Sequence, residues 1–161
     1  MNKEKPKLLR SASTVYAFDL FSTIFQSKSN SVFAHLFNLK LLFNPSILGI
    51  RWMIITSAPK ILRPFIKFQC FINGLAPVMV VTSPYWFKKI DSEKYILNIL
   101  LNINNGSFPI YIKSNLIRRV SYISNNIELC KFINNNINRM HNNVLAQSVI
   151  DFWHQKFESV L

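Results

Sequence analysis

Hydrophobic positions along this chain form short unbroken runs that alternate with longer segments of helical spacing. Four runs have the β-branched and aromatic content of buried strands: Val15 to Phe18, Trp52 to Ile55, Val78 to Thr82 and Arg119 to Ile123. Apolar residues three and four positions apart predict helices over Ser31 to Phe43, Lys60 to Ile72, Asp91 to Ile103 and Glu128 to Asn138. This alternation predicts an α/β fold with a mainly parallel sheet and right-handed crossovers.

The two ends of the chain have patterns of their own. Residues 1–14 are basic and polar with one proline, which predicts a flexible arm. After an Asn-rich stretch, apolar residues fall near one face between Val144 and Val160, which predicts an amphipathic C-terminal helix packed on the sheet. An exposed aromatic face for a partner protein is the alternative. We therefore expect one domain over residues 15–161.

The longest run without a charged residue extends from Phe68 to Phe87. Its length alone would let it cross a bilayer. It contains Gln69, Asn73, Gly74 and two prolines, so it predicts a helix end, a turn and a strand, with no transmembrane segment. No signal peptide is predicted either, because the first apolar stretch is interrupted by a charge within a few residues. We therefore expect a cytoplasmic protein.

Composition adds a strong positive charge, with nineteen Lys and Arg against seven Asp and Glu, or a net +12. Such a balance favours polyanionic partners, either nucleic acid or an anionic membrane surface. The compositional bias of an AT-rich genome is the alternative, because it raises Lys together with Asn, Ile and Phe. The two cysteines, Cys70 and Cys130, lie far apart in apolar surroundings. They predict buried thiols in a reducing compartment and no metal or redox motif.

Polar residues stand where the predicted strands end. Asp19 ends the first strand, and Thr56 and Ser57 follow the second. Ligands of open parallel sheets bind beyond the carboxyl ends of the strands, so Asp19 there can serve as a nucleophile or a metal ligand. The hydroxyls before the second helix suit an anionic oxygen. Capping of the following turn or helix is the alternative for all three side chains.

The order of these residues resembles the motifs of the haloacid dehalogenase-like (HAD) superfamily. Phe18 to Ile24, FDLFSTI, is similar to the first motif, in which a strand-end Asp is the nucleophile and a Thr follows four residues later, here Asp19 and Thr23. The strand with Thr56 and Ser57 resembles the second motif, whose hydroxyl binds the transferred phosphoryl group. Val120 to Ile133, VSYISNNIELCKFI, resembles the fourth motif. The resemblance implies a three-layer Rossmann-like domain, and the short intervals between motifs imply that it lacks a cap domain.

Two features of the sequence depart from the phosphatase pattern of that superfamily. Many HAD phosphatases have a second Asp two residues after the nucleophile as general acid, and Phe21 stands there instead, as an aromatic residue does in some dehalogenases. The Asp-rich cluster of the fourth motif is replaced by Ser124, Asn125 and Asn126, which match the Ser-x-Asn of metal-independent dehalogenases. We expect these three residues to contact the substrate or another anion.

The cofactor and the lysine of the resembled site are less defined. Mg²⁺ prefers carboxylate ligands, and Glu128 is the only acid of the segment that resembles the fourth motif. No acidic partner of Asp19 is identified, so Asp19 is a weak metal ligand and Mg²⁺ is a doubtful cofactor. An acid outside the motifs could still supply the missing ligand, the candidates being Asp91, Glu93 and Asp151. The lysine that stabilises charge in HAD sites is Lys113 by position, with Lys94 as the second candidate.

Three functions follow from the resemblance. The first is a HAD-like phosphatase in which Asp19 attacks phosphorus while Lys113 and a hydroxyl of Thr56 or Ser57 hold the oxygens. Its capless site would suit large phosphorylated substrates. The second is a catalytically degenerate HAD-like domain that binds a partner such as nucleic acid. The third is metal-independent dehalogenation through an ester on Asp19, against which the missing cap argues.

Overall fold

The computed structural model describes residues 14–21, 23–27, 39–88, 90–107, 109–112, 114–117, 119–137 and 155. They form an α/β architecture in which a parallel sheet lies between two helical layers. The strands, in spatial order, are β5 (Val80–Val81), β4 (Trp52–Ile55), β1 (Thr14–Asp19) and β8 (Arg119–Ile123). All three pairings are parallel, as the sequence predicts.

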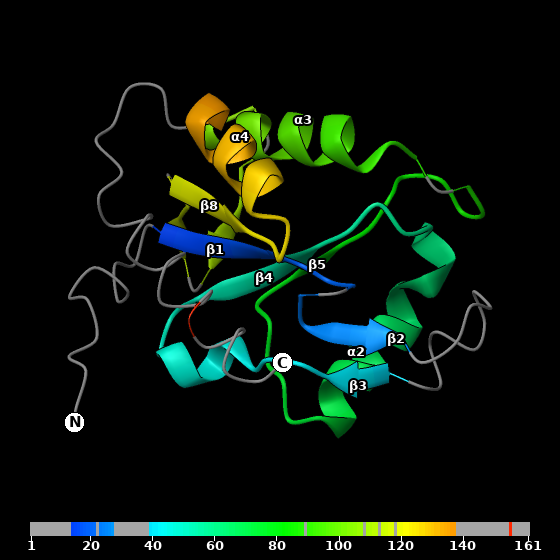
Figure 1. Ribbon diagram of the computed structural model, residues 1–161. Helices are drawn as coiled ribbons and strands as arrows, with labels where there is room; N and C mark the ends of the chain where they lie inside the picture. The colour runs from blue at the N-terminus through cyan, green and yellow to red at the C-terminus, as the bar shows by residue number, and fades with distance from the viewer. Residues whose placement is uncertain are drawn as a thin grey trace.

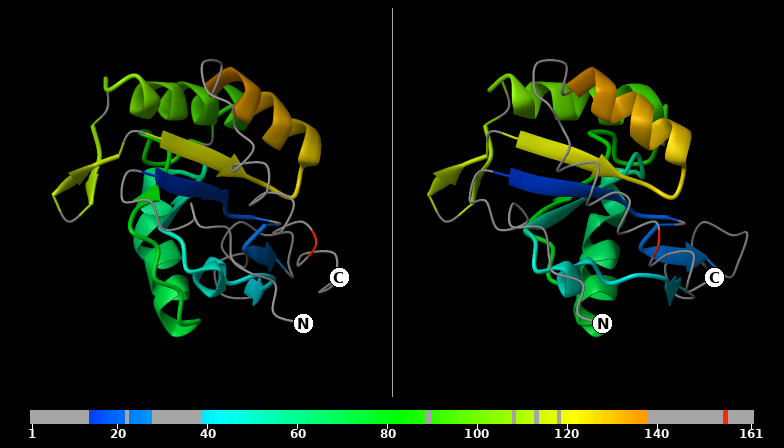
Figure 2. Two further views of the ribbon diagram at one scale, coloured as in Figure 1. Left: turned by 90° about the vertical axis from the view of Figure 1, so that its left-hand side faces the viewer. Right: turned by 60° about the vertical axis from the view of Figure 1, so that its left-hand side comes forward.

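Helices cover both faces of this sheet. One face carries α3 (Ser92–Asn104) and α4 (Ile127–Ile137), and the other carries α2 (Arg63–Ile72), which continues from the 3-10 turn η3 (Lys60–Leu62) (Figures 1 and 2). Side chains of β1 point alternately to the two faces of the sheet. Phe18 packs in the core on the α2 side, and Ala17 packs in the core with α3 and α4. The predicted helices over 91–103 and 128–138 agree with α3 and α4 to within one residue, and the one predicted over 60–72 is η3 followed by α2.

The predicted helix from Ser31 to Phe43 is wrong where the structure describes it. Residues 39–41 form β3 (Leu39–Leu41), antiparallel to β2 (Phe25–Ser27), and residues 31–38 lie outside the described part. Leu39 and Leu41 pack against the core while Lys40 between them is exposed, which is the alternation of a half-buried strand. Over so few residues, helical and strand spacing of leucines look alike.

Smaller elements complete the described chain. They are the 3-10 turn η2 (Pro45–Leu48) and an antiparallel hairpin of β6 (Tyr111–Ile112) and β7 (Asn115–Leu116). The uncharged run from Phe68 to Phe87 is a helix end, a turn and a short strand, as predicted. No helix in the described part is long and apolar enough to cross a bilayer. The N-terminal arm and the C-terminal helix over 144–160 lie outside it, except that Thr14 begins β1 and Gln155 is helical.

Asparagine side chains close the edge of the sheet at β8. The Tyr122 N–H donates to Asn134 Oδ1 at 2.9 Å, and Asn134 Nδ2 donates to the Tyr122 carbonyl at 2.8 Å. The Val120 N–H donates to Asn104 Oδ1 at 3.0 Å. These amides, from α4 and α3, replace the neighbouring strand that the edge lacks, so its buried backbone groups are satisfied.

We expect Asn134→Ala to lower the free energy of unfolding by about 2 kcal/mol, because it leaves the buried Tyr122 N–H without an acceptor. Chemical denaturation of the full chain measures this loss. The matched control is Asn135→Ala, since Asn135 is exposed on the same helix and should change stability by less than about 0.5 kcal/mol. Equal effects of the two substitutions would contradict the role of Asn134 at the edge.

Candidate functional site

Asp19 lies at the carboxyl end of the central strand, and its carboxylate is half-buried. Oδ1 accepts a hydrogen bond from the Leu20 N–H at 2.9 Å, and Oδ2 accepts one from the Ser124 hydroxyl at 3.5 Å. Ser124 directly follows β8, whose register with β1 pairs Phe18 with Ile123. The parallel ladder therefore brings together the two segments that resemble the first and the fourth motif, although they are more than a hundred residues apart in the sequence.

Thr23 joins the loop after β1 to the loop after β8. Its side chain is fully buried. The hydroxyl oxygen accepts from the Asn125 N–H at 3.0 Å, and the hydroxyl lies 3.4 Å from Asn125 Oδ1, to which it donates. Thr23 and Asn125 thus hold the two loops on either side of Asp19 in a fixed relation.

The three polar residues after β8 have different surroundings. Ser124 is buried and faces Asp19, and its oxygen accepts from the Asn126 N–H at 3.2 Å. Asn126 Oδ1 accepts from the Leu129 N–H at 3.1 Å, which makes it the N-cap of α4. Of the three residues predicted to contact an anion, Ser124 therefore donates to Asp19, the candidate nucleophile. Asn125 is hydrogen-bonded to Thr23, and Asn126 caps the start of α4.

Thr56 and Ser57 lie at the same edge of the sheet, because the register pairs Asp19 with Ile55 directly before them. Both side chains are buried. The Thr56 oxygen accepts from the Ala58 N–H at 3.2 Å, and the Ser57 hydroxyl is hydrogen-bonded to the Ser92 hydroxyl at the start of α3. The Thr56 hydroxyl is the acceptor in this bond, so its own proton remains to be donated.

Of the charged candidates, the structure describes Lys94, Asp91 and Glu93. Lys113 and Asp151 lie outside the described residues. Lys94 and Glu93 are exposed in the first turn of α3, where the Asp91 carboxylate accepts from both of their N–H groups, at 3.4 and 3.0 Å. Asp91 is therefore a helix cap.

Asp19 offers one ligand of the kind that Mg²⁺ prefers, its carboxylate. Within the described segments no group of three His, Cys, Asp or Glu side chains is arranged to hold a metal ion. The Leu20 N–H and the Ser124 hydroxyl, which donate to that carboxylate, are neutral. Phe21, which stands where many HAD phosphatases have their second Asp, is half-buried and packs against the core on the α2 side.

Tyr122 is a polar neighbour of the site that the sequence prediction missed. Its ring is fully buried, and no hydrogen bond to its hydroxyl is found in the described part of the chain. Burial raises the pKa of this phenol, and the negative charge of Asp19 raises it further. The nearby Ser124 hydroxyl lowers the pKa of Tyr122, although the two hydroxyls do not have the geometry of a hydrogen bond. Because side chains alternate along a strand, Tyr122 falls on the same side of the sheet as Ser124, which follows β8. This spacing was the signal in the sequence that could have placed Tyr122 near the site.

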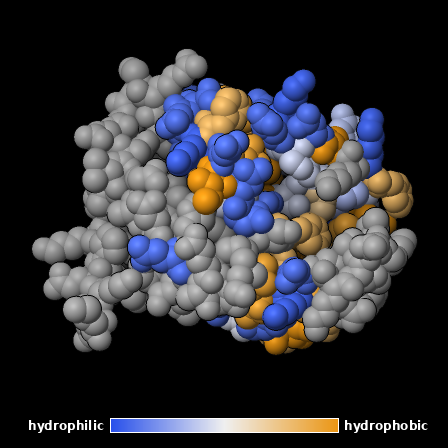
Figure 3. Space-filling view, viewed as in Figure 1, coloured by the Kyte–Doolittle hydropathy of each residue, from blue (hydrophilic) through white to orange (hydrophobic). Residues whose placement is uncertain are grey.

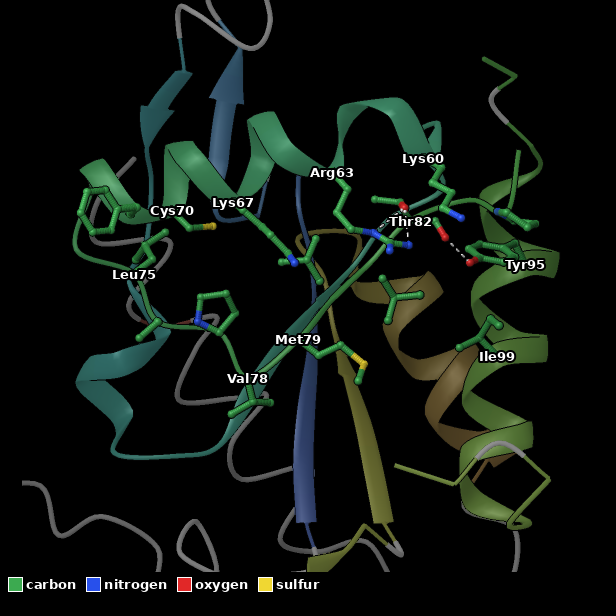
Figure 4. Close-up of a pocket in the computed structure, with 16 residues that line it drawn as sticks. Lys60, Arg63, Lys67, Cys70, Leu75, Val78, Met79, Thr82, Tyr95 and Ile99 are labelled. Atoms are coloured by element: carbon green, nitrogen blue, oxygen red, sulfur yellow. Dashed lines mark hydrogen bonds between the residues drawn. The ribbon is translucent and has the colours of Figure 1, made fainter. Parts of the chain in front are cut away.

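A groove of about 840 Å³ runs along the outer edge of β5, between α2 and α3. Figure 4 shows Lys60, Arg63 and Lys67 extending from η3 and α2 toward it. At the carboxyl end of β5, Arg63 donates two hydrogen bonds to Thr82 Oγ1, at 3.2 and 3.0 Å. The Tyr95 hydroxyl donates to the Thr82 carbonyl. One end of this cationic groove therefore lies beyond the carboxyl ends of the strands, where Asp19 also lies.

We expect Tyr122→Phe to leave the free energy of unfolding unchanged or to raise it by about 1 kcal/mol, because it removes a buried hydroxyl to which no described residue is hydrogen-bonded. Denaturation curves of the full chain test this, with Tyr111→Phe at an exposed position as the control. A loss above about 1 kcal/mol would mean that the hydroxyl is hydrogen-bonded in solution.

Comparisons of the chain with protein-family models, with curated proteins and with solved structures yield no match.

Proposed function

We propose that this protein is a HAD-like hydrolase, a phosphatase whose nucleophile is Asp19. The observation that carries the proposal is the hydrogen bond between Ser124 and Asp19 Oδ2, because it unites the first and fourth resembled motifs at one sheet edge. The strand order gives further support, since Thr56 follows the strand adjacent to Asp19. In this proposal the domain has the three-layer Rossmann-like HAD fold without a cap.

The chemistry would proceed by two displacements at phosphorus. An oxygen of the Asp19 carboxylate forms a bond to phosphorus while the ester P–O bond breaks and its electron pair leaves with the alcohol oxygen. Water then attacks phosphorus, loses a proton to solvent, and displaces the restored carboxylate. The Leu20 N–H and the Ser124 hydroxyl would orient the carboxylate, and the Thr56 hydroxyl would donate to a phosphoryl oxygen.

The packing of Phe21 sets the expected choice of substrate. A general acid typically accelerates departure of the leaving group by about 10²- to 10⁴-fold. Phe21 stands at the position of the family acid, and its side chain has no ionisable group and is half-buried against the core. The enzyme should therefore favour esters whose leaving oxygen is stable without protonation, such as aryl phosphates.

The second candidate is a catalytically degenerate domain that binds a polyanion, possible partners including nucleic acid. Two observations favour it. Phe21 belongs to the hydrophobic packing, and the amides of Asn125 and Asn126 are engaged in joining the loops and capping α4. In that case the hydrogen bonds that Asp19 accepts from the Leu20 N–H and the Ser124 hydroxyl would hold together the ends of β1 and β8.

We expect the protein to hydrolyse 4-nitrophenyl phosphate about 100-fold faster than glycerol phosphate, because the alkyl ester needs protonation. Asp19→Asn should abolish both activities, since the amide is a poor nucleophile. Release of nitrophenol and of phosphate is measured with and without Mg²⁺. Turnover that requires Mg²⁺ would show that the site binds a metal ion.

The matched control is Asp91→Asn, the same chemical change at a carboxylate that caps α3. Asn is as good an N-cap as Asp, so this variant should keep both its stability and its activity. An Asp19→Asn variant as active as the wild type would overturn the proposal. A folded wild type without turnover on either ester would favour the binding domain.

A further inference from the structure

Exposed hydrophobic side chains gather on one side of the molecule. Of the thirteen large hydrophobic residues that are exposed in the described part, nine fall between Ile61 and Phe87. They are Ile61, Phe65, Phe68, Phe71, Ile72, Val78, Tyr85, Trp86 and Phe87. In Figure 3, hydrophobic surface appears toward the lower right, over the region where Figure 1 places α2. Contiguous exposed apolar surface of this kind marks an interaction site.

The exposed residues of η3 and α2 form a stripe. Ile61, Phe65, Phe68 and Ile72 are spaced by four, three and four residues, which places them on one face of the helix. The opposite face, with Leu62, Ile66 and Cys70, is buried in the core, so α2 is apolar on two sides. Apolar residues of a surface helix normally form one stripe that faces the core, whereas α2 has a second apolar side that is exposed.

The aromatic loop after β5 extends the stripe. The Lys60 N–H donates to the Tyr85 carbonyl at 2.8 Å, and the Ile61 N–H donates to the Trp86 carbonyl at 3.3 Å. These bonds hold the loop beside the start of η3, so that Tyr85, Trp86 and Phe87 adjoin the helix stripe. We call the stripe and these three aromatic residues together the α2 surface. In the loop, the side chains with the largest exposed fractions are Phe87, at 81%, and Trp86, at 57%.

The segment that carries the α2 surface has charges of one sign. The sequence has no Asp or Glu between Asp19 and Asp91. Lys60 and Lys67 extend from η3 and α2 toward the groove along β5, on one flank of the helix, and Lys88 follows the aromatic loop. Lys60 Nζ lies 5.3 Å from the centre of the Trp86 ring, a cation–π arrangement that places positive charge next to an exposed indole.

We propose that the α2 surface binds the surface of an anionic lipid membrane. A helix with Phe and Ile on one side and Lys beside them can lie in the plane of the interface, with Trp and Tyr at headgroup level. The lysines would face lipid phosphates, and no acid in this segment opposes them. Single-stranded nucleic acid fits less well, because bases stack on aromatic rings whereas Ile61 and Ile72 gain only from an apolar environment. The inference does not depend on catalysis at Asp19.

The test is co-sedimentation of the full chain with phosphatidylcholine vesicles, with and without phosphatidylserine. We expect binding to the anionic vesicles that weakens as salt is added. The double variant Phe65→Ser, Phe68→Ser should reduce the affinity about tenfold or more, because both rings lose burial in the interface. The control Phe132→Ser should bind as the wild type does, since this ring is similarly exposed, at 43%, but lies on α4 in the opposite layer.

A second pair of variants isolates the charge. Lys60→Gln combined with Lys67→Gln should weaken binding to anionic vesicles, whereas Lys131→Gln on the exposed side of α4 should have at most half that effect. The proposal is overturned if anionic vesicles are not bound, or if Phe132→Ser lowers affinity as much as the α2 double variant. It is also overturned if the α2 variant abolishes self-association or binding to single-stranded DNA while vesicle binding is unchanged.

Discussion

The parallel pairing of β1 on both of its sides is the constraint on which the rest of this structure depends. β1 hydrogen-bonds to β4 and to β8, and its residues from Val15 to Phe18 are fully or almost fully buried. A strand enclosed in this way cannot shift its register by one residue without exchanging the residues of its two faces. The position of Asp19 relative to Ile55 and Ser124 is fixed by that register. The candidate site is thus a consequence of how the core packs.

Most polar side chains at this edge of the sheet also serve local structure. Thr23 joins two loops, Asn126 caps α4, and the Thr56 oxygen accepts a backbone N–H. Such bonds reduce the conformational freedom of the groups around Asp19, and preorganisation of this kind benefits catalysis as well as binding. The same geometry therefore supports both candidate functions, and the packing of Phe21 in the core is what separates them.

Much of the fold could be predicted because its strands are unbroken apolar runs: β4 and β8 match their predicted ranges, and β1 begins one residue earlier. The hairpin strand Leu39–Leu41 could not, since its partner is supplied by tertiary structure and its leucines also fit a helix. At the site, motif order predicted the meeting of Asp19 with Ser124. The roles of Asn134 and Tyr122 depend on side-chain orientation across the sheet, which the sequence pattern leaves open.

The two helical layers of the domain are unequal, and this inequality bears on function. The α3 and α4 layer closes the β8 edge with the amides of Asn104 and Asn134. The α2 layer leaves aromatic rings exposed and lines the β5 edge with cations. The aromatic loop and η3 follow the carboxyl ends of β5 and β4, the edge that also carries Asp19. A membrane bound at the α2 surface would therefore adjoin the candidate site, so that a phosphorylated lipid headgroup is the substrate that would connect the two proposals.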